Sequence, residues 1–499
     1  MPRLLFCQST FSIILGNDST LESITSVNQL NSGNYIFSGL AKDEVSVLNE
    51  FYLNFYKTNV DGELIESYEF RKDSFNLSQD VVNNITRLEN DSSLFMVGNI
   101  QSTTQGTVNG YFFSIDTAFN STQFMEIHSD STEGYNCILN SSNQIFTIYG
   151  NSRSQGAGSA DYLLLKLDSS GVVLNDTTYG GVQFEQSSNG IKINDNHFVV
   201  SGRTFSDATQ RAGFGSNAAN GQFIAIDSNL NEIWNSVLYT DGVDLAPIIK
   251  DYGYFYQLIE YPIHPSIIGL FNTPIIGQID VSNGNLLWID TIQISEELTS
   301  QRFMEAVDST SFIVFMQVAS QDIPYNYAKI IKYNNQGQKI WQRSYYEGNH
   351  NGCQLNTMMV GADGSLVFGG TIANSSNQSQ DAWILKLTPD GCLNDVNCGI
   401  ISGLIDLTPT KSKFGVYAYP NPSSSKTFIT VENTRNFIDD ELVLKIFDNE
   451  GKLIMMQNQL LSGEIPIFEV NTKDYPKGLY HIQACIAGLQ CGEASLLIK

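Results

Sequence analysis

Four of the seven cysteines stand in two close pairs, and disulfide formation is the chemistry that their spacing suits best. Cys392 and Cys398 flank a short polar loop, and Cys485 and Cys491 lie three residues on either side of Gly488. If Gly488 is the tip of a hairpin, its two cysteines face each other across the strands, where side chains come close. The spacing predicts the disulfides Cys392–Cys398 and Cys485–Cys491, and with them an oxidising compartment.

Zinc binding is the alternative use of these cysteines. Neither pair has the C-x-x-C spacing of a zinc site, and no H-x₃₋₅-H motif lies near either pair. Disulfides are therefore the favoured interpretation, and Cys7, Cys137 and Cys353 have no assigned role.

Motifs of catalysis and cofactor binding do not stand out in the sequence. The five histidines do not pair at metal-ligand spacing, and no G-x-S-x-G, Walker or dinucleotide-binding motif occurs. The pairs Asp363-Gly364 and Asp390-Gly391 fit turns, because no calcium loop of the D-x-[DN]-x-[DN]-G type surrounds them. We predict no catalytic, cofactor-binding or metal-binding residue, although two carboxylates brought together from distant segments would leave no trace in the sequence.

The formal net charge of −25 bears on possible partners. Nucleic acids and anionic membranes both require a basic surface, so the charge disfavours them as partners. Charged residues make up only 16% of the chain. Asn, Ser, Thr, Gly and Tyr take their place, which favours short strands and many turns. No stretch reaches the ~18 consecutive apolar residues of a membrane span.

The N-terminus carries a very short apolar run, Leu4–Phe6, after a single basic residue, Arg3. A signal peptide needs about 7–15 apolar residues. Residues 1–8 are therefore interpreted as the remnant of a signal peptide whose true start lies further upstream. A lipoprotein acylation box at Leu4–Cys7 is a less favoured alternative.

A strand–turn–strand pattern repeats along the first 400 residues. Its copies cover 51–64, 111–120, 161–174, 222–234, 275–288, 328–341 and 382–393. The equivalent turn positions recur every 52–59 residues, at Gly62, Phe119, Gly171, Leu230, Gly284, Gly337 and Gly391. Each copy has an apolar strand upstream, and such runs suit strands buried on both faces. A period near 50 residues is typical of radially repeated sheets.

The chain begins with the strand that its last repeat lacks. Phe11–Leu15 resembles the final strand of a copy, and no such strand follows the copy at 382–393. We expect Phe11–Leu15 to pair with Ala382–Leu387 and close a ring, because closure removes exposed sheet edges. An open solenoid of sheets is the alternative, and its edges would need caps.

The copy at 161–174, followed by Thr178–Gly181 and His197–Gly202, resembles the repeats of seven-bladed β-propellers in secreted bacterial proteins. The resemblance implies an all-β chain in which residues 9–398 form a closed propeller, with seven blades favoured over six or eight. It implies little about function. Tryptophans at matched repeat positions are interpreted as blade packing: Trp234, Trp288 and Trp341.

Residues 399–413 are interpreted as a linker, and residues 414–499 as a small antiparallel, Ig-like β-sandwich. The segment opens with Val416–Pro422, where two prolines disfavour helix. Alternating strands follow, and Asn449-Glu450-Gly451 forms a hairpin turn between two of them.

Four blocks of this segment, in order, resemble type A sorting domains of the type IX secretion system. They are the Y-P-N-P opening at 419–422, the strand–turn–strand at 445–452, the L-x-x-G-x-Y block at 475–480 with Tyr475 in place of Leu, and the final strand at 495–499. The residues that carry the resemblance are Tyr419, Pro420, Asn421, Pro422, Gly451, Gly478, Leu479, Tyr480, Leu497, Ile498 and Lys499.

The resemblance implies that an outer-membrane translocon of a Gram-negative bacterium reads residues 414–499 as an address. In that family the domain is commonly removed after passage, which leaves the protein secreted or anchored at the outer surface. An extracellular binding or adhesion module for a glycan or a surface protein is the favoured function, because loops around a rigid ring offer a broad recognition surface. A glycan-active hydrolase or lyase is the alternative, and close carboxylates in a pocket at the channel mouth would favour it.

Overall fold

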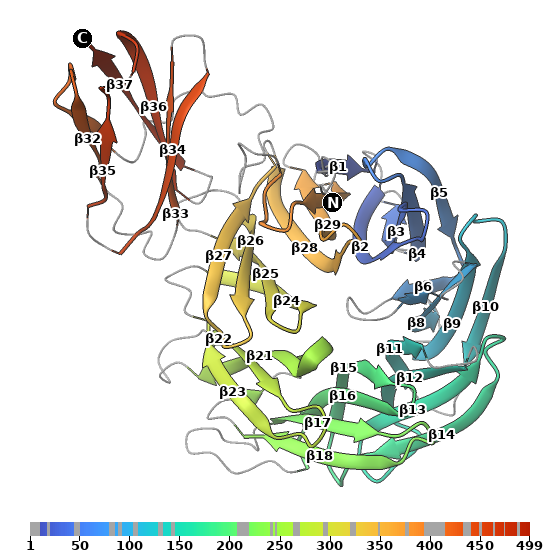
Figure 1. Ribbon diagram of the computed structural model, residues 1–499. Helices are drawn as coiled ribbons and strands as arrows, with labels where there is room; N and C mark the ends of the chain where they lie inside the picture. The colour runs from blue at the N-terminus through green and yellow to red at the C-terminus, as the bar shows by residue number, and fades with distance from the viewer. Residues whose placement is uncertain are drawn as a thin grey trace, which may run out of the picture.

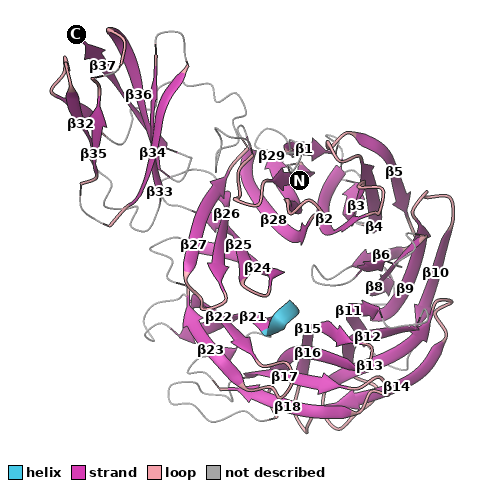
Figure 2. Cartoon of the chain, viewed as in Figure 1, coloured by secondary structure: helices cyan, strands magenta, loops and turns pink. Residues whose placement is uncertain are grey.

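The structure is a computed structural model of the chain. It describes residues 10–16, 20–43, 50–78, 85–87, 92–102, 108–127, 133–140, 145–206, 219–239, 243–244, 247–262, 270–292, 298–319, 326–347, 350–374, 379–393, 415–432, 441–448, 452–462, 465–473, 475–486 and 490–499. Their regular structure is β throughout, apart from one three-residue 3₁₀ turn, η2 (Asp251–Gly253) (Figure 2). The all-β prediction is therefore confirmed. No helix within these ranges is long and apolar enough to cross a membrane.

Most strands up to residue 393 belong to antiparallel units that are arranged around a common centre (Figure 1). Each unit is named here by its strands. The β2–β5 unit contains β2 (Thr20–Gln29), β3 (Tyr35–Asp43), β4 (Phe51–Thr58) and β5 (Leu64–Phe70). The β6–β10 unit contains β6 (Phe75–Ser78), β7 (Ile85–Arg87), β8 (Ser93–Ser102), β9 (Val108–Asp116) and β10 (Thr122–Ile127).

The next units follow the same plan along the chain. The β11–β14 unit contains β11 (Glu133–Asn140), β12 (Ile145–Ser152), β13 (Asp161–Asp168) and β14 (Val173–Tyr179). The β15–β18 unit contains β15 (Glu185–Asn194), β16 (His197–Thr204), β17 (Asn220–Ile226) and β18 (Glu232–Leu238). The β19–β23 unit contains β19 (Val243–Asp244), β20 (Ile248–Ile249), β21 (Tyr254–Pro262), β22 (Leu270–Ile279) and β23 (Leu286–Thr291).

The last two units complete this part of the chain. The β24–β27 unit contains β24 (Leu298–Asp308), β25 (Ser311–Ala319), β26 (Asn326–Asn334) and β27 (Lys339–Tyr345). The β28–β30 unit contains β28 (His350–Val360), β29 (Leu366–Asn374) and β30 (Gln380–Leu387). Single parallel pairings, Asn326 with Gly352 and Leu21 with Gln380, join three of these units into one twelve-stranded sheet.

The N-terminal strand β1 (Phe11–Leu15) supplies the outer strand of the β28–β30 unit. It pairs antiparallel with β30, from Phe11 opposite Lys386 to Leu15 opposite Ala382. The fully buried Trp383 of β30 donates a hydrogen bond from Nε1 to Ser12 Oγ at 3.0 Å. The predicted pairing of Phe11–Leu15 with Ala382–Leu387 is confirmed.

The repeated turns have one backbone conformation. All the turn positions found in the sequence have positive φ angles between 56° and 89°: Gly62, Phe119, Gly171, Leu230, Gly284, Gly337 and Gly391. In the turn after β13, Asp168 Oδ1 accepts hydrogen bonds from Ser170 N at 2.9 Å and Val172 N at 3.0 Å. A left-handed residue after a polar cap produces a bulged hairpin, which explains why glycine predominates at this position.

The same turns pack on the outer strand of the preceding unit. Several of these glycines touch an aromatic ring, so that a Cβ placed on each would lie 3.0 Å or less from it. The pairs are Gly284 with Trp234, Gly337 with Trp288, Gly391 with Trp341, and Gly62 with Phe11 of β1. The prediction that the matched tryptophans serve packing is confirmed for Trp234, Trp288 and Trp341.

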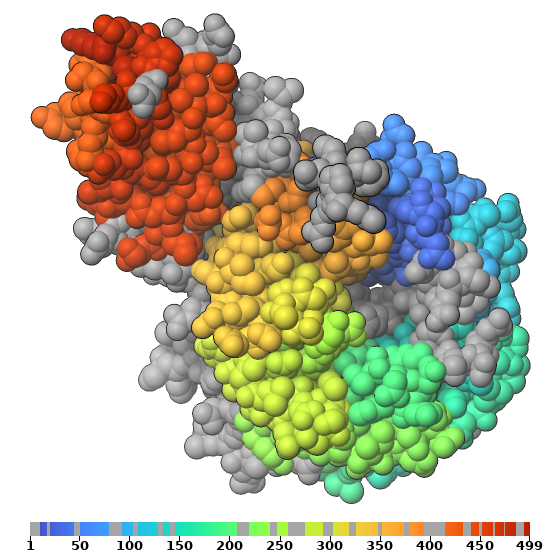
Figure 3. All heavy atoms as spheres, viewed as in Figure 1, coloured from blue at the N-terminus to red at the C-terminus, as the bar shows by residue number. Residues whose placement is uncertain are grey.

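The C-terminal domain contains two further sheets and forms a lobe of its own beside the units described above (Figure 3). One contains β31 (Val416–Tyr419), β32 (Lys426–Val431) and β35 (Ile467–Asn471). The other contains β33 (Glu441–Phe447), β34 (Leu453–Leu460), β36 (Gly478–Ile486) and β37 (Gln490–Ile498). Buried side chains of both sheets, such as Ile429, Phe468 and Ile482, share one hydrophobic core.

The structure describes some of the cysteines that the sequence predicts to form disulfides. Cys485 lies directly opposite Cys491 in the β36–β37 pairing. Cys392 and Cys485 are each disulfide-bonded in the structure, whereas Cys137 and Cys353 are buried thiols. Cys398 and the side chain of Cys491 lie outside the described part of the chain, so the two pairings remain predictions. The predicted signal-peptide remnant at 1–8 and the linker at 399–413 lie outside it too.

Deleting residues 1–16 should destabilise the protein strongly, because it removes β1 and uncovers Trp383 and the turn at Gly62. We expect the free energy of unfolding to fall by about 3–5 kcal/mol, the size of the loss of a large core side chain. Deleting residues 1–8 keeps β1 and is the matched control. Equal thermal stability of the two deletion variants would contradict the role given to β1.

Alkylation under denaturing, non-reducing conditions should separate the two classes of cysteine. We expect mass spectrometry to find labelled Cys137 and Cys353, and to find the four paired cysteines protected until a reductant is added. Labelling of both members of either pair without a reductant would refute that disulfide.

Candidate functional site

Inner segments of several units line a cavity of about 360 Å³. They are Thr25–Asn28 of β2, Lys250–Tyr252 at η2, Phe303–Val307 of β24 and Asn356–Val360 of β28. Figure 1 places η2 at the inner edge of its unit, where the units face a common centre. The volume falls within the range of about 300–1,000 Å³ typical of small-molecule pockets.

An ion pair joins two units at the wall of this cavity. Lys250 Nζ lies 2.6 Å from Glu305 Oε2, and the two side chains are 8% and 23% exposed. Burial raises the pKa of Glu305 above its ordinary value, and the charge of Asp251 adds to this effect, whereas Lys250 opposes it. The two opposite charges therefore compensate each other, and the ion pair connects β24 to the turn before β21.

The turn at η2 carries two further polar side chains. Asp251 and Tyr252 are both exposed, and Tyr252 takes a left-handed conformation with φ 62° and ψ 13°. This conformation costs a non-glycine residue about 1–2 kcal/mol. Hydrogen bonds from Gly253 N to Lys250 O at 3.1 Å and from Gln278 Nε2 to Tyr252 O at 2.9 Å hold the turn. Desolvation raises the pKa of Asp251, and Lys250 limits the rise.

Amide and hydroxyl groups of β2 and β28 also line the cavity. Asn356 of β28 is almost fully buried, and its Nδ2 donates to Ser23 Oγ at 2.9 Å and to Ile24 O at 3.0 Å, both on β2. Gln354 Nε2 in turn donates to Asn356 Oδ1 at 2.5 Å. These bonds fix the spacing of β28 and β2, and thereby the width of the cavity.

The arrangement is suited to holding a small polar molecule. It places an ammonium group, two carboxylates and a phenol around one space, at Lys250, Glu305, Asp251 and Tyr252. Carboxylates accept hydrogen bonds from hydroxyl groups, and an exposed tyrosine ring provides a flat apolar face. The sequence pattern singles out none of these residues, because they come from separate repeats and carry no local motif.

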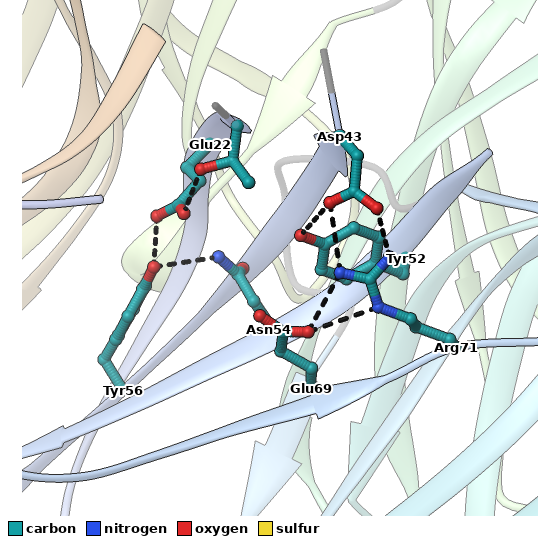
Figure 4. Close-up of polar contacts among 8 residues, drawn as sticks. Glu22, Asp43, Tyr52, Asn54, Tyr56, Glu69 and Arg71 are labelled. Carbon is teal, nitrogen blue, oxygen red and sulfur yellow. Dashed lines mark hydrogen bonds and ion pairs between the residues drawn. The ribbon is translucent and has the colours of Figure 1, made fainter. Parts of the chain in front are cut away.

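A second polar cluster lies on the β2–β5 unit (Figure 4). Arg71 binds Asp43 through two nitrogens, at 2.6 and 3.1 Å, and Glu69 through two nitrogens, at 3.0 and 3.2 Å. Its guanidinium carbon also stacks 3.5 Å from the centre of the Tyr52 ring. Hydrogen bonding from Arg71 lowers the pKa of Asp43. With its charges paired, this group is interpreted as structural.

The other half of the cluster surrounds a buried carboxylate. Glu22 is 6% exposed and accepts hydrogen bonds from Thr20 Oγ1 at 2.7 Å and from the hydroxyl of Tyr56. Asn54 Nδ2 donates to the same tyrosine hydroxyl at 3.2 Å. Burial, followed by the hydrogen bond to Glu22, raises the pKa of Tyr56. The network joins β2 to β4, and the sequence gives no local signal for it.

The structure brings the first and last predicted sorting residues together. Asn421 Nδ2 donates to Ser495 O at 2.7 Å, and Leu497 N donates to Asn421 Oδ1 at 2.9 Å. Ser423 N and Lys499 N complete this contact with hydrogen bonds to Leu497 O and Ser423 O, at 2.8 and 3.0 Å. The Y-P-N-P turn is therefore attached to the final strand. Both of its prolines follow cis peptide bonds, at Tyr419–Pro420 and Asn421–Pro422.

The remaining sorting residues differ in exposure. Tyr419 is 79% exposed, Leu479 and Leu497 are partly exposed, and Tyr480 and Ile498 are buried. Tyr480 donates from its hydroxyl to Pro476 O at 2.8 Å, which holds the segment that leads into Gly478 and β36. Gly451 lies outside the described residues.

Comparisons with solved structures return propellers at low sequence identity. The chain is similar to the β-propeller domain of the Trilobed protease from Pyrococcus furiosus, with 10% identity, a TM-score of 0.43, and coverage of 77% of this chain and 99% of that chain. It is also similar to the polysaccharide lyase Uly1, with 7% identity, a TM-score of 0.43, and coverage of 76% and 99%. For the GH93 α-L-arabinofuranosidase of Fusarium graminearum in complex with arabinobiose, the values are 8%, 0.39, 76% and 98%.

A comparison with curated proteins finds no match to the chain. The C-terminal domain does match a family. Residues 417–488 match the family described as secretion system C-terminal sorting domain. This match lies inside the segment 414–499 that resembles a sorting domain in sequence. The protein therefore carries a sorting domain at its C-terminus and is a secreted or cell-surface protein exported by the type IX secretion system.

Proposed function

We propose that the exported part of the chain is a closed, seven-bladed β-propeller that binds a hydroxyl-rich ligand of the glycan class. The observation that carries this proposal is the 360 Å³ cavity, where polar groups from separate units converge. We propose an Ig-like β-sandwich for the C-terminal domain, since its two sheets share one core.

Closure of the ring is supported by contacts that recur between successive units. A lysine of one unit donates to a turn carbonyl of the next: Lys57 to Thr117 O at 2.8 Å, Lys166 to Ser228 O at 2.5 Å, and Lys386 to Val60 O at 3.3 Å. The last of these joins the β28–β30 unit to the β2–β5 unit. This contact between the last and the first unit is of the same kind as the contacts between successive units, and it supports closure. With β1 counted in the last unit, the described strands group into seven units, which supports seven blades.

The chemistry of the cavity favours a neutral polar ligand. A polyanion would meet a chain with a net charge of −25, and Lys250, the one lysine among the described lining residues, is already paired with Glu305. Sugars offer several hydroxyl groups and one apolar face, which match Asp251 and the exposed ring of Tyr252. Binding to the ring after export would make the protein an adhesion or capture module at the cell surface.

An extracellular glycan hydrolase or lyase is the second candidate. The observation that favours it is the presence of two carboxylates with raised pKa, Glu305 and Asp251, beside one lysine. A carboxyl group with a raised pKa can serve as a general acid. If the protein cleaves a bound glycan, and if this activity is lost in both Asp251→Asn and Glu305→Gln, the function is that of a hydrolase or lyase and not of a simple binding module.

Two substitutions at η2 should weaken ligand binding. After a glycan array has identified a ligand, Tyr252→Ala and Asp251→Asn should each raise its Kd about tenfold, which corresponds to about 1.4 kcal/mol. Tyr239→Ala removes an equally prominent tyrosine, 60% exposed, that is not part of the cavity, and is the matched control. Calorimetry that finds the same Kd in the two cavity variants as in the control would place the binding site elsewhere.

Removing residues 414–499 should retain the propeller in the periplasm, because the proposed translocon partner reads its address there. Fractionation and immunodetection would locate the truncated protein, and its thermal unfolding would show that the ring still folds. Normal arrival of the truncated protein at the cell surface would contradict the assignment of the address to this domain.

A further inference from the structure

Two buried carboxylates meet where the β11–β14 unit adjoins the β15–β18 unit. Asp161 begins β13 and is 1% exposed, and Glu185 begins β15 and is fully buried. A single parallel pairing of Ala160 with Phe184 holds the two strand starts side by side. This joint is separate from the cavity at η2, and it plays no part in the proposed ligand binding.

One oxygen of each carboxylate points to the same small space. A Cβ placed on Gly180 would lie 1.9 Å from Asp161 Oδ1 and 2.7 Å from Glu185 Oε2. Any residue other than glycine would therefore fill the space in front of both oxygens. A nearby glycine, Gly158, lies equally close to two carbonyl oxygens. A Cβ placed on it would lie 2.0 Å from Gln183 O and 2.7 Å from Gly181 O.

The hydrogen bonds of the joint leave one carboxylate oxygen unused. Glu185 accepts from Thr204 Oγ1 at 3.0 Å and from Gly181 N at 3.3 Å. Asp161 Oδ2 accepts from Gly158 N at 3.1 Å, whereas its buried Oδ1 has no hydrogen-bond partner. Among the described residues, neither carboxylate forms an ion pair with a lysine, arginine or histidine.

Such a pair is costly without a counter-charge. Burial raises the pKa of Glu185. Hydrogen bonds from Ser206, Thr204 and Gly181 oppose this rise, and the neighbouring charge of Asp161 adds a smaller increase. An uncompensated buried charge costs several kcal/mol, so native proteins pair such charges or place a metal ion between them. A proton shared by the two carboxylates is the other way to reduce the repulsion.

We propose that a calcium ion binds between Asp161 and Glu185 and clamps the two units together. Calcium prefers carboxylate and carbonyl oxygens, and it accepts irregular coordination by six to eight ligands. The two side chains would supply the charged ligands, with backbone carbonyls and water completing the shell. Magnesium is less suitable, because it demands near-ideal octahedral geometry. Export brings the protein into surroundings where even weak sites, with Kd of about 10⁻⁴–10⁻³ M, are filled.

The preceding joint provides a matched comparison within the same chain. Glu133 begins β11 opposite Ser152, as Glu185 begins β15 opposite Thr204. On the strand before it, Asn109 occupies the position that corresponds to Asp161. Asn109 pairs with Ile100, two residues after Gly98, and Asp161 pairs with Ser152, two residues after Gly150. Glu133 thus has an amide where Glu185 has a second carboxylate.

Two serines hydrogen-bond to one oxygen of Glu133. Its Oε1 accepts from Ser152 Oγ at 3.1 Å and from Ser154 Oγ at 2.8 Å. Glu133→Gln is therefore the control: it shows whether removing a buried glutamate charge at the equivalent position of another unit is enough to change the response to calcium.

Thermal unfolding of the full chain at pH 7.5 tests the proposal. The probe is CaCl₂ at about 5 mM against EDTA, with MgCl₂ at the same concentration as the ionic control. We expect calcium to raise the Tm by about 2 °C or more, as mass action on a folded-state site requires. Asp161→Asn and Glu185→Gln should abolish this rise, whereas Glu133→Gln should keep it.

The Tm of the variants in EDTA shows whether a lost calcium response is caused by a folding defect. Neutralising one carboxylate relieves the repulsion, so Asp161→Asn should unfold in EDTA at a Tm no lower than that of the wild type. The proposal is overturned if calcium and magnesium act equally, or if the calcium response persists in Asp161→Asn. It is also overturned if the wild type ignores calcium and is instead stabilised in EDTA between pH 7 and pH 5, which would indicate a shared proton.

Discussion

The contact on which the arrangement of the units depends is that of a left-handed turn residue with the outer strand of the preceding unit. A glycine at this position brings the turn backbone directly onto a tryptophan, as at Gly284 on Trp234. Where the position is Phe119, its ring packs on Phe55 and Tyr68 of the preceding unit and fills the same gap. The contact is non-local, because it links successive repeats, and it sets the spacing of the units.

The seam at the N-terminus uses the same contact with different residues. Phe11 of β1 takes the place of the tryptophans against Gly62, and Lys386 reaches Val60 O as Lys166 reaches Ser228 O. The sequence could predict this seam because strand patterns and turn glycines are local signals that recur at a fixed period. It could not predict Lys250 beside Glu305, or Asp161 beside Glu185. Each of these pairs joins residues from different units, and ordinary solvated residues of the same types look identical in the sequence.

In the C-terminal domain, the sorting blocks could be predicted from the sequence, whereas the contacts between them could not. Its sorting blocks are contiguous in sequence and could be read directly, although their spatial relation could not. Asn421 is 74 residues from Ser495 and 76 residues from Leu497 in the final strand, and the structure joins them through both ends of one amide. An amide that donates and accepts at once fixes the register of the last strand relative to the opening turn. The first and last blocks therefore form one surface element.

Acid should weaken the turns, whereas at the joint that contains Glu305 it should remove the cost of a buried charge. Hydrogen bonds, first from Ser170 and from Ser282, lower the pKa values of the turn residues Asp168 and Asp280. Their stabilisation is present above the unfolded-state pKa near 4 and is lost as the pH falls through the lower folded-state values. Burial raises the pKa of Glu305, so the cost of its charge is relieved as the pH falls through that higher value. Mild acid therefore removes the cost of the buried Glu305 charge before it weakens the turns, and the turn contacts between the units persist at a pH where that charge is gone.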